Sequence, residues 1–118
     1  MKRMDTGRFY LLGQRRHYDP ALWNKMSAEQ QQEDVDLREG LLAWCQSLVG
    51  QIDEGGSVTA VEILDQAGVP GPTAVDVTFD AGDDGEARDL MRLFPLALSR
   101  ERRRLELLRE NSRPTLFP

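Results

Sequence analysis

The chain has 118 residues, of which 40% are hydrophobic and 30% are charged, so it suits one folded domain and is too apolar for general disorder. Its net charge is −5, its single cysteine excludes an internal disulfide, and no apolar run approaches the roughly 18 residues that a membrane helix needs. Because the first five residues also lack the character of a signal peptide, we predict a cytoplasmic protein with one domain over 1–118, no membrane contact and flexible tails at 1–7 and 112–118.

The first predicted element is a short strand over 8–12. This run is apolar and aromatic, and Gly13 ends it. Residues 14–26 are irregular, but Asp19-Pro20 marks a turn. Pro20 is suited to the first position of a helix, so we expect a one-turn helix that reaches Trp23.

The clearest element is a long helix over about 28–53. Ser27 and Gln30 form a capping box at its start, and Gly55-Gly56 would end it. Apolar residues recur at helical spacing along the segment, and Cys45 lies among them. We therefore expect Cys45 to be a buried structural thiol.

Residues 57–69 allow two interpretations. Thr59 and Glu62 could cap a two-turn helix over 60–67, which Gly68 would end. The run 58–63 is also compatible with a strand. The residues at the two ends favour the helix, and the strand stays open as the alternative.

The last part of the chain predicts a strand followed by helices. Residues 73–80 alternate between apolar and polar with period two, which indicates a strand with one solvated face that pairs antiparallel with 8–12. The acidic loop 82–85 suits a helix cap, and two C-terminal helices are expected, over 86–94 and from Pro95 to about 111. The predicted fold class is α+β, dominated by helices, with a small antiparallel sheet.

No residue pattern points to a catalytic set, a cofactor or a metal. His17, the only histidine, is expected to be exposed or packed in a turn, and with Cys45 alone it cannot supply the usual zinc ligands. The acidic loop lacks two decisive ligands of a calcium-binding EF-hand. A carboxylate-based enzyme that uses Asp76 or Asp80 is the weakest alternative.

The charge is sorted along the chain. Residues 1–26 carry a net charge of +4, residues 27–94 carry −12, and residues 95–118 carry +3. Segregated charge favours binding to a partner over catalysis. The competing interpretation, in which the basic ends fold back and neutralise the acidic middle within one molecule, stays open.

Two sets of charged residues are the candidate partner-binding sites. They are Glu29, Glu33, Asp34 and Asp36 on the acidic side, and Arg15, Arg16, Arg100, Arg103 and Arg104 on the basic side. They predict a non-enzymatic accessory protein (an adaptor, inhibitor or assembly factor) that docks on a larger protein with a basic groove. The alternative is a nucleic-acid-associated protein that uses the arginine-rich helix. The leucines of that helix, such as Leu107 and Leu108, are also compatible with a homodimer.

Overall fold

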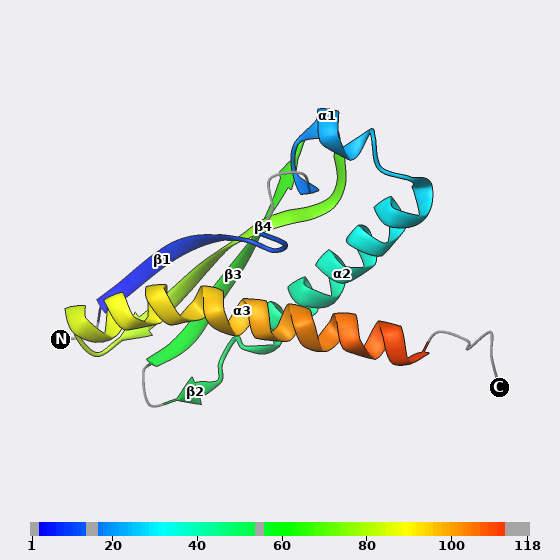
Figure 1. Ribbon diagram of the computed structural model, residues 1–118. Helices are drawn as coiled ribbons and strands as arrows, with labels where there is room; N and C mark the ends of the chain where they lie inside the picture. Colours follow the sequence, from blue (N-terminus) through cyan, green and yellow to red (C-terminus); the bar gives the residue numbers. More distant parts are fainter. Residues whose placement is uncertain (1–2, 14–16, 54–55, 113–118) are drawn as a thin grey trace.

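The computed structural model describes residues 3–13, 17–53 and 56–112. The elements are β1 (Arg3–Tyr10), α1 (Pro20–Trp23), α2 (Ala28–Ser47), β2 (Ile52–Asp53), β3 (Gly56–Gln66), β4 (Val69–Ala81) and α3 (Asp84–Ser112) (Figure 1). The predicted α+β class is therefore confirmed. No helix in these residues combines the length and the apolar character that crossing a bilayer requires.

The described strands form one antiparallel sheet in the order β1-β4-β3-β2. The predicted pairing of the first strand with residues 73–80 is confirmed, because β1 runs beside β4 in register from Arg3↔Ala81 to Tyr10↔Ala74. The first strand begins at Arg3, so residues 3–7, predicted as part of a flexible tail, belong to the sheet. Residues 113–118 of the other predicted tail lie outside the described residues.

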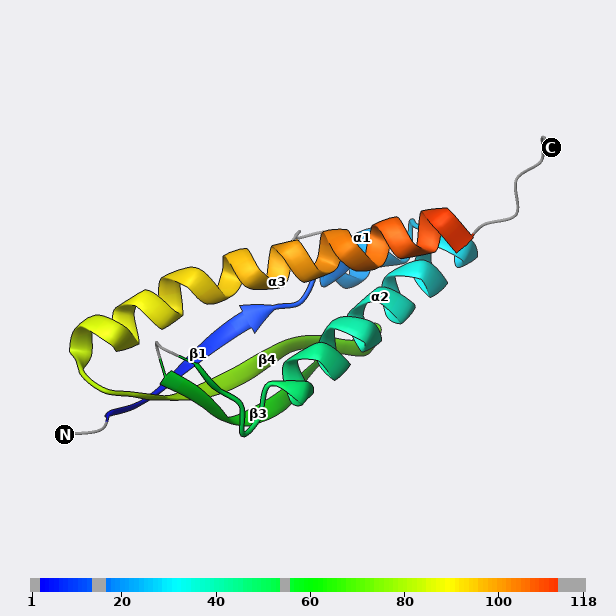
Figure 2. The ribbon, with the colours of Figure 1, turned by 90° about the horizontal axis from the view of Figure 1, so that it is seen from below.

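Both long helices cover the same face of the sheet (Figure 2). The alternation predicted for β4 is seen, because Val75, Val77 and Phe79 are buried on the side of the core. The ring of Phe94 on α3 lies with its centroid 5.6 Å from Phe79 and 5.8 Å from Trp44 on α2. Burial of each such side chain contributes roughly 1.5–3 kcal/mol, and the aromatic contacts join the helices to the sheet.

Helix α2 begins as predicted but ends earlier than predicted. Ser27 Oγ accepts a hydrogen bond from the backbone N–H of Gln30 (3.1 Å), which caps its start. The helix ends at Ser47, and the prediction that it extends to 53 is wrong. Gly50 has a φ of +84°, and its N–H donates to the carbonyl of Val58 (2.9 Å), so the chain turns here toward β2. Cys45 is fully buried as expected, and burial raises the pKa of its thiol to about 12.

The helix predicted within 57–69 is wrong, because this segment is strand β3. Its residues pair with β4, for example Glu62 with Asp76 and Ile63 with Val75. Gly68, with a φ of +84°, forms the turn between the two strands. A glycine at positive φ serves a helix end or a hairpin turn equally well, so the local signal did not separate the two structures.

The two predicted C-terminal helices are one continuous helix, α3, with Pro95 inside it. Asp83 caps its start as predicted, because its Oδ1 accepts a hydrogen bond from the N–H of Glu86 (2.9 Å). Pro95 lies on an exposed side of the helix. The proline ring removes the donor that the carbonyl one turn earlier would meet in a regular helix, yet the helix continues through this position.

Candidate functional site

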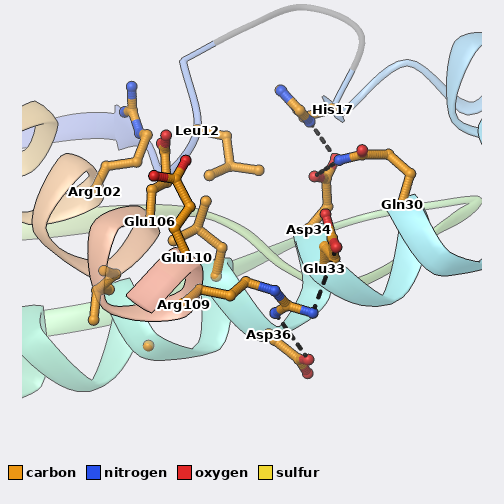
Figure 3. Close-up of a pocket in the computed structure, with 13 residues that line it drawn as sticks. Leu12, His17, Gln30, Glu33, Asp34, Asp36, Arg102, Glu106, Arg109 and Glu110 are labelled. Carbon is orange, nitrogen blue, oxygen red and sulfur yellow. Dashed lines mark hydrogen bonds and ion pairs between the residues drawn. The ribbon is translucent and has the colours of Figure 1, made fainter. Parts of the chain in front are cut away.

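A pocket of about 410 Å³ lies between α2, α3 and the segment that follows β1 (Figure 3). Most of the residues that line it are charged or polar. Helix α2 contributes Gln30, Glu33, Asp34, Asp36, Leu37 and Gly40; helix α3 contributes Arg102, Leu105, Glu106, Arg109 and Glu110; and the segment after β1 contributes Leu12 and His17. Among the described residues, the lining therefore holds five carboxylates, two guanidinium groups and one imidazole.

A glycine allows the two helices to come close at the pocket. A Cβ atom at position 40 would lie only 3.2 Å from Cδ1 of Leu105, so any larger residue at this position would press on α3. Contacts further along show that the helices run in opposite directions, since Asp36 lies near Arg109 and Trp44 lies near Phe94. This arrangement brings the acidic first half of α2 beside the last turns of α3.

Asp34 and His17 form a buried pair at one side of the pocket. Asp34 is 3% exposed, accepts a hydrogen bond from Nε2 of Gln30 (2.9 Å), and is hydrogen-bonded to Nδ1 of His17, which is 6% exposed. Burial alone would raise the pKa of Asp34, but the hydrogen bonds from His17 and Gln30 and the charges of His17 and Arg38 hold it below its usual 3.8. Asp34 is therefore a buried structural carboxylate.

Arg38 lies one helical turn beyond Asp34 and is 1% exposed. Its Nη1 donates to the carbonyl of Pro72 and its Nη2 to the carbonyl of Pro70, both at 2.7 Å. Its guanidinium lies over the ring of Trp23, 5.2 Å from the centroid. Burial lowers the pKa of Arg38, and the charge of Asp34 opposes this shift. Arg38 thus ties α2 to α1 and to the start of β4, next to the pocket.

The two arginines of the pocket have different environments. Arg102 is fixed to the backbone, because its Nε and Nη2 donate to the carbonyl of Leu11 at 3.2 and 2.8 Å. Arg109 extends from α3 to α2, where its guanidinium lies 3.8 Å from the carboxylate of Glu33 and 3.5 Å from that of Asp36 (Figure 3). The side chains of Arg109 and Asp36 are 41% and 47% exposed, so this bridge lies at the opening of the pocket.

The predicted acidic site residues fall into three positions. Glu33 and Asp36 lie in the pocket lining, and Glu29 is exposed on α2 outside it. Asp34 is buried, so its assignment to a partner-binding surface is corrected: the carboxylate is used inside the molecule. The bridge from Arg109 also shows that the basic end of the chain does neutralise part of the acidic middle.

The three predicted basic site residues on α3 lie apart from the pocket. Arg100, Arg103 and Arg104 are exposed on α3 and do not line it. Arg103 lies 3.6 Å from Glu106, and Nε of Arg104 donates to Glu101 (2.9 Å). Arg15 and Arg16 lie outside the described residues.

The carboxylates considered for catalysis are also elsewhere. Asp76 accepts hydrogen bonds from Nε and Nη2 of Arg8 at 2.9 and 3.2 Å, and this partner lowers its pKa. Neither Asp76 nor Asp80 is part of the pocket lining. Within the described residues, no three His, Cys, Asp or Glu side chains are grouped to hold a metal ion. The groups that the described residues bring to the pocket are mainly carboxylates and the guanidinium groups that face them.

Comparison of the chain with protein-family models, with curated proteins and with solved structures gives no match.

Proposed function

We propose that this chain is a non-enzymatic binding protein that receives a basic segment of a larger protein partner in the pocket between α2 and α3. The observation that supports this function is the concentration of four carboxylates besides the buried Asp34, those of Glu33, Asp36, Glu106 and Glu110, in one recess of about 410 Å³. A recess of this size accepts a protruding side chain, and its charge selects a cationic one.

The pocket has the two kinds of surface that a long basic side chain needs. Leu12, Leu37 and Leu105 offer apolar contact to an aliphatic stem. Glu106 and Glu110 on α3 and the acids of α2 offer carboxylates to its charged end. Glu29, which is exposed in the first turn of α2, extends the negative field that attracts such a partner.

The nucleic-acid alternative has weaker support. Two of its three described arginines are paired with glutamates of their own helix. Leu96 and Leu107 are exposed beside these arginines at 60% and 41%, and they gain nothing from contact with phosphates. Nucleic-acid binding stays a prediction, and an oligonucleotide probe tests it in the same experiment as the peptides.

The test is fluorescence anisotropy with four labelled probes: an arginine-rich peptide, a lysine-rich peptide and an acidic peptide of equal length, and a single-stranded oligonucleotide. We expect both basic peptides to bind, and their affinity to fall at least tenfold between about 0.02 and 0.5 M salt, because salt screens the carboxylates. Binding of the oligonucleotide with no binding of either basic peptide would instead favour the nucleic-acid function.

Charge-reversal variants locate the binding site. The double variant Glu33→Lys with Asp36→Lys should weaken binding of the basic peptides at least tenfold, about 1.4 kcal/mol. The matched control is Glu62→Lys, since Glu62 is exposed on strand β3 and does not line the pocket. Equal affinity of the double variant and the control, with both folded by circular dichroism, would contradict the proposed site.

A further inference from the structure

The bridge at the opening of the pocket shows how this site holds a guanidinium. Glu33 and Asp36 lie one helical turn apart on α2, and the guanidinium of Arg109 lies between their carboxylates (Figure 3). A guanidinium is planar and presents several donors, so it can meet two carboxylates at once, whereas an ammonium acts as a point charge. The two acids therefore form a receptor for an arginine side chain, and the chain fills it with its own arginine.

From this geometry we infer that Glu33 and Asp36 form an arginine subsite, and that an arginine of the partner binds by taking the place of Arg109. This inference rests on the proposed function and names the chemical group that the pocket selects. Arg109 then acts as an internal competitor, which lowers the affinity of the pocket for every other cation.

The resident arginine lies where water can compete for it. Its guanidinium is 3.8 Å from Glu33 and 3.5 Å from Asp36 at the exposed opening of the pocket, and ion pairs that water reaches contribute little to stability. Arg102, in contrast, is hydrogen-bonded at 2.8 Å to a backbone carbonyl and is only partly exposed. Of the two arginines in the pocket, Arg102 is part of the wall and Arg109 is the replaceable group.

Displacement does not leave Arg109 without a counter-charge. Glu106 lies three residues earlier on the same helix, lines the pocket and already lies 3.6 Å from Arg103, an exposed pair that leaves room for a second cation. Residues spaced by three on a helix are neighbours, so the released guanidinium can turn to this carboxylate. The incoming arginine then meets Glu33 and Asp36, and its stem lies along the apolar wall formed by residues such as Leu37.

The experiment compares Arg109→Ala with Arg100→Ala. Both variants remove one positive charge from α3, but Arg100 is exposed and does not line the pocket. We expect Arg109→Ala to bind the arginine-rich peptide about three to ten times more tightly than the unsubstituted chain, with a smaller gain for the lysine-rich peptide. Arg100→Ala should change either affinity less than twofold. Arg109→Lys, which keeps the charge but not the planar group, should give a rise smaller than that of Arg109→Ala.

The outcomes separate this inference from the function on which it rests. If the unsubstituted chain binds basic peptides but Arg109→Ala binds them equally or more weakly, the arginine subsite is wrong and the proposed function stands. If neither the chain nor its folded Arg109→Ala variant binds any basic peptide, the proposed function fails, and the inference fails with it. If Arg109→Ala and Arg100→Ala gain equally, the effect is one of net charge, which also overturns the subsite.

Discussion

Two charged residues occupy the buried stripe of α2. Asp34, Arg38, Leu41 and Cys45 are the buried residues of this helix, and their spacings of four, three and four are those of a single helical face. Leu41 and Cys45 form the apolar part of this buried stripe, and Asp34 and Arg38 extend it toward the start of the helix. Position along the helix thus marked these two residues as inward-facing, although their charge suggested the surface.

The same stripe explains which part of the site the sequence could reveal. Asp36 is two residues from Asp34 and therefore faces another direction, so a contiguous acidic run could not form one surface. The buried partner of Asp34 is His17, which comes from a separate segment. Only tertiary structure brings the two together, and neither charge nor periodicity in the sequence indicates that contact.

The buried carboxylate gives stability a dependence on acid pH. The pKa of Asp34 in the folded chain lies below its usual 3.8, so the unfolded chain takes up the proton first as the pH falls. The stabilisation by the charged carboxylate is therefore complete above about pH 5 and is lost as the pH falls below about 4. We expect Asp34→Asn to cost about 1–3 kcal/mol near pH 5, and the difference to narrow as the pH falls toward 2.5, because the stabilisation by the charged carboxylate decreases below the pKa of the unfolded chain.

Urea unfolding followed by tryptophan fluorescence between about pH 5 and pH 2.5 measures this difference. The control is Asp89→Asn, because Asp89 is exposed on α3, and its curve should run parallel to that of the unsubstituted chain. A gap between Asp34→Asn and the unsubstituted chain that stays constant over the whole range would show that the charge of Asp34 does not stabilise the fold.

At the level of elements, Pro95 lowers the stability of helix α3. Proline in a helix interior removes one backbone hydrogen bond and costs about 3 kcal/mol or more. Replacing Pro95 by Ala restores the N–H, and part of the gain is offset because the unfolded chain becomes more flexible. We therefore expect Pro95→Ala to stabilise the protein by about 1–2 kcal/mol.

Thermal unfolding by circular dichroism tests this expectation. Leu96→Ala serves as the neighbouring control, because Leu96 is 60% exposed and its loss should change stability by less than about 0.5 kcal/mol. An unchanged or lower Tm for Pro95→Ala would mean that proline fits this helix without cost.

Elements that are set by neighbouring residues in the sequence could be predicted, whereas strands that are set by pairing with a distant segment of the chain could not. Helix α1 was predicted because Asp19 and Pro20 carry its start, and Asp19 Oδ1 does accept a hydrogen bond from the N–H of Ala21 (3.0 Å). The period-two pattern likewise identified β4. Strand β3 was missed because Thr59 with Glu62 and Gly68 are residues typical of the two ends of a helix. The segment forms a strand because its backbone pairs with β4, which comes later in the chain.

At the scale of the whole molecule, the distribution of charge predicts that salt weakens the binding of a basic partner but strengthens self-association of the chain. Two copies that paired their α3 helices antiparallel, with Leu96 against Leu107, would place Arg100 of one copy opposite Arg103 of the other. Like charges in direct opposition are unfavourable, and salt reduces the repulsion. We expect a monomer of 13.4 kDa at low ionic strength, and any self-association to increase with salt.

Sedimentation equilibrium across a range of salt concentrations provides the measurement. Arg100→Gln with Arg103→Gln should strengthen self-association at low salt, and Arg88→Gln, at an exposed position nearer the start of α3, should not. A dimer that is tightest at low salt would require a different interface from the one formed by these leucines.

The pairing of β1 with β4 also sets an order of events during synthesis. Arg3 of the first strand is matched to Ala81 of the central strand, so most of the chain must leave the ribosome before the edge of the sheet can close. Helix α2 is complete long before that and can form early, because its contacts are local. Phe94 of α3, which packs on both Phe9 and Phe79, arrives later still. A nascent chain halted before α3 therefore exposes a strand edge and an uncovered apolar face, and this is the stage at which protection by a chaperone would matter most.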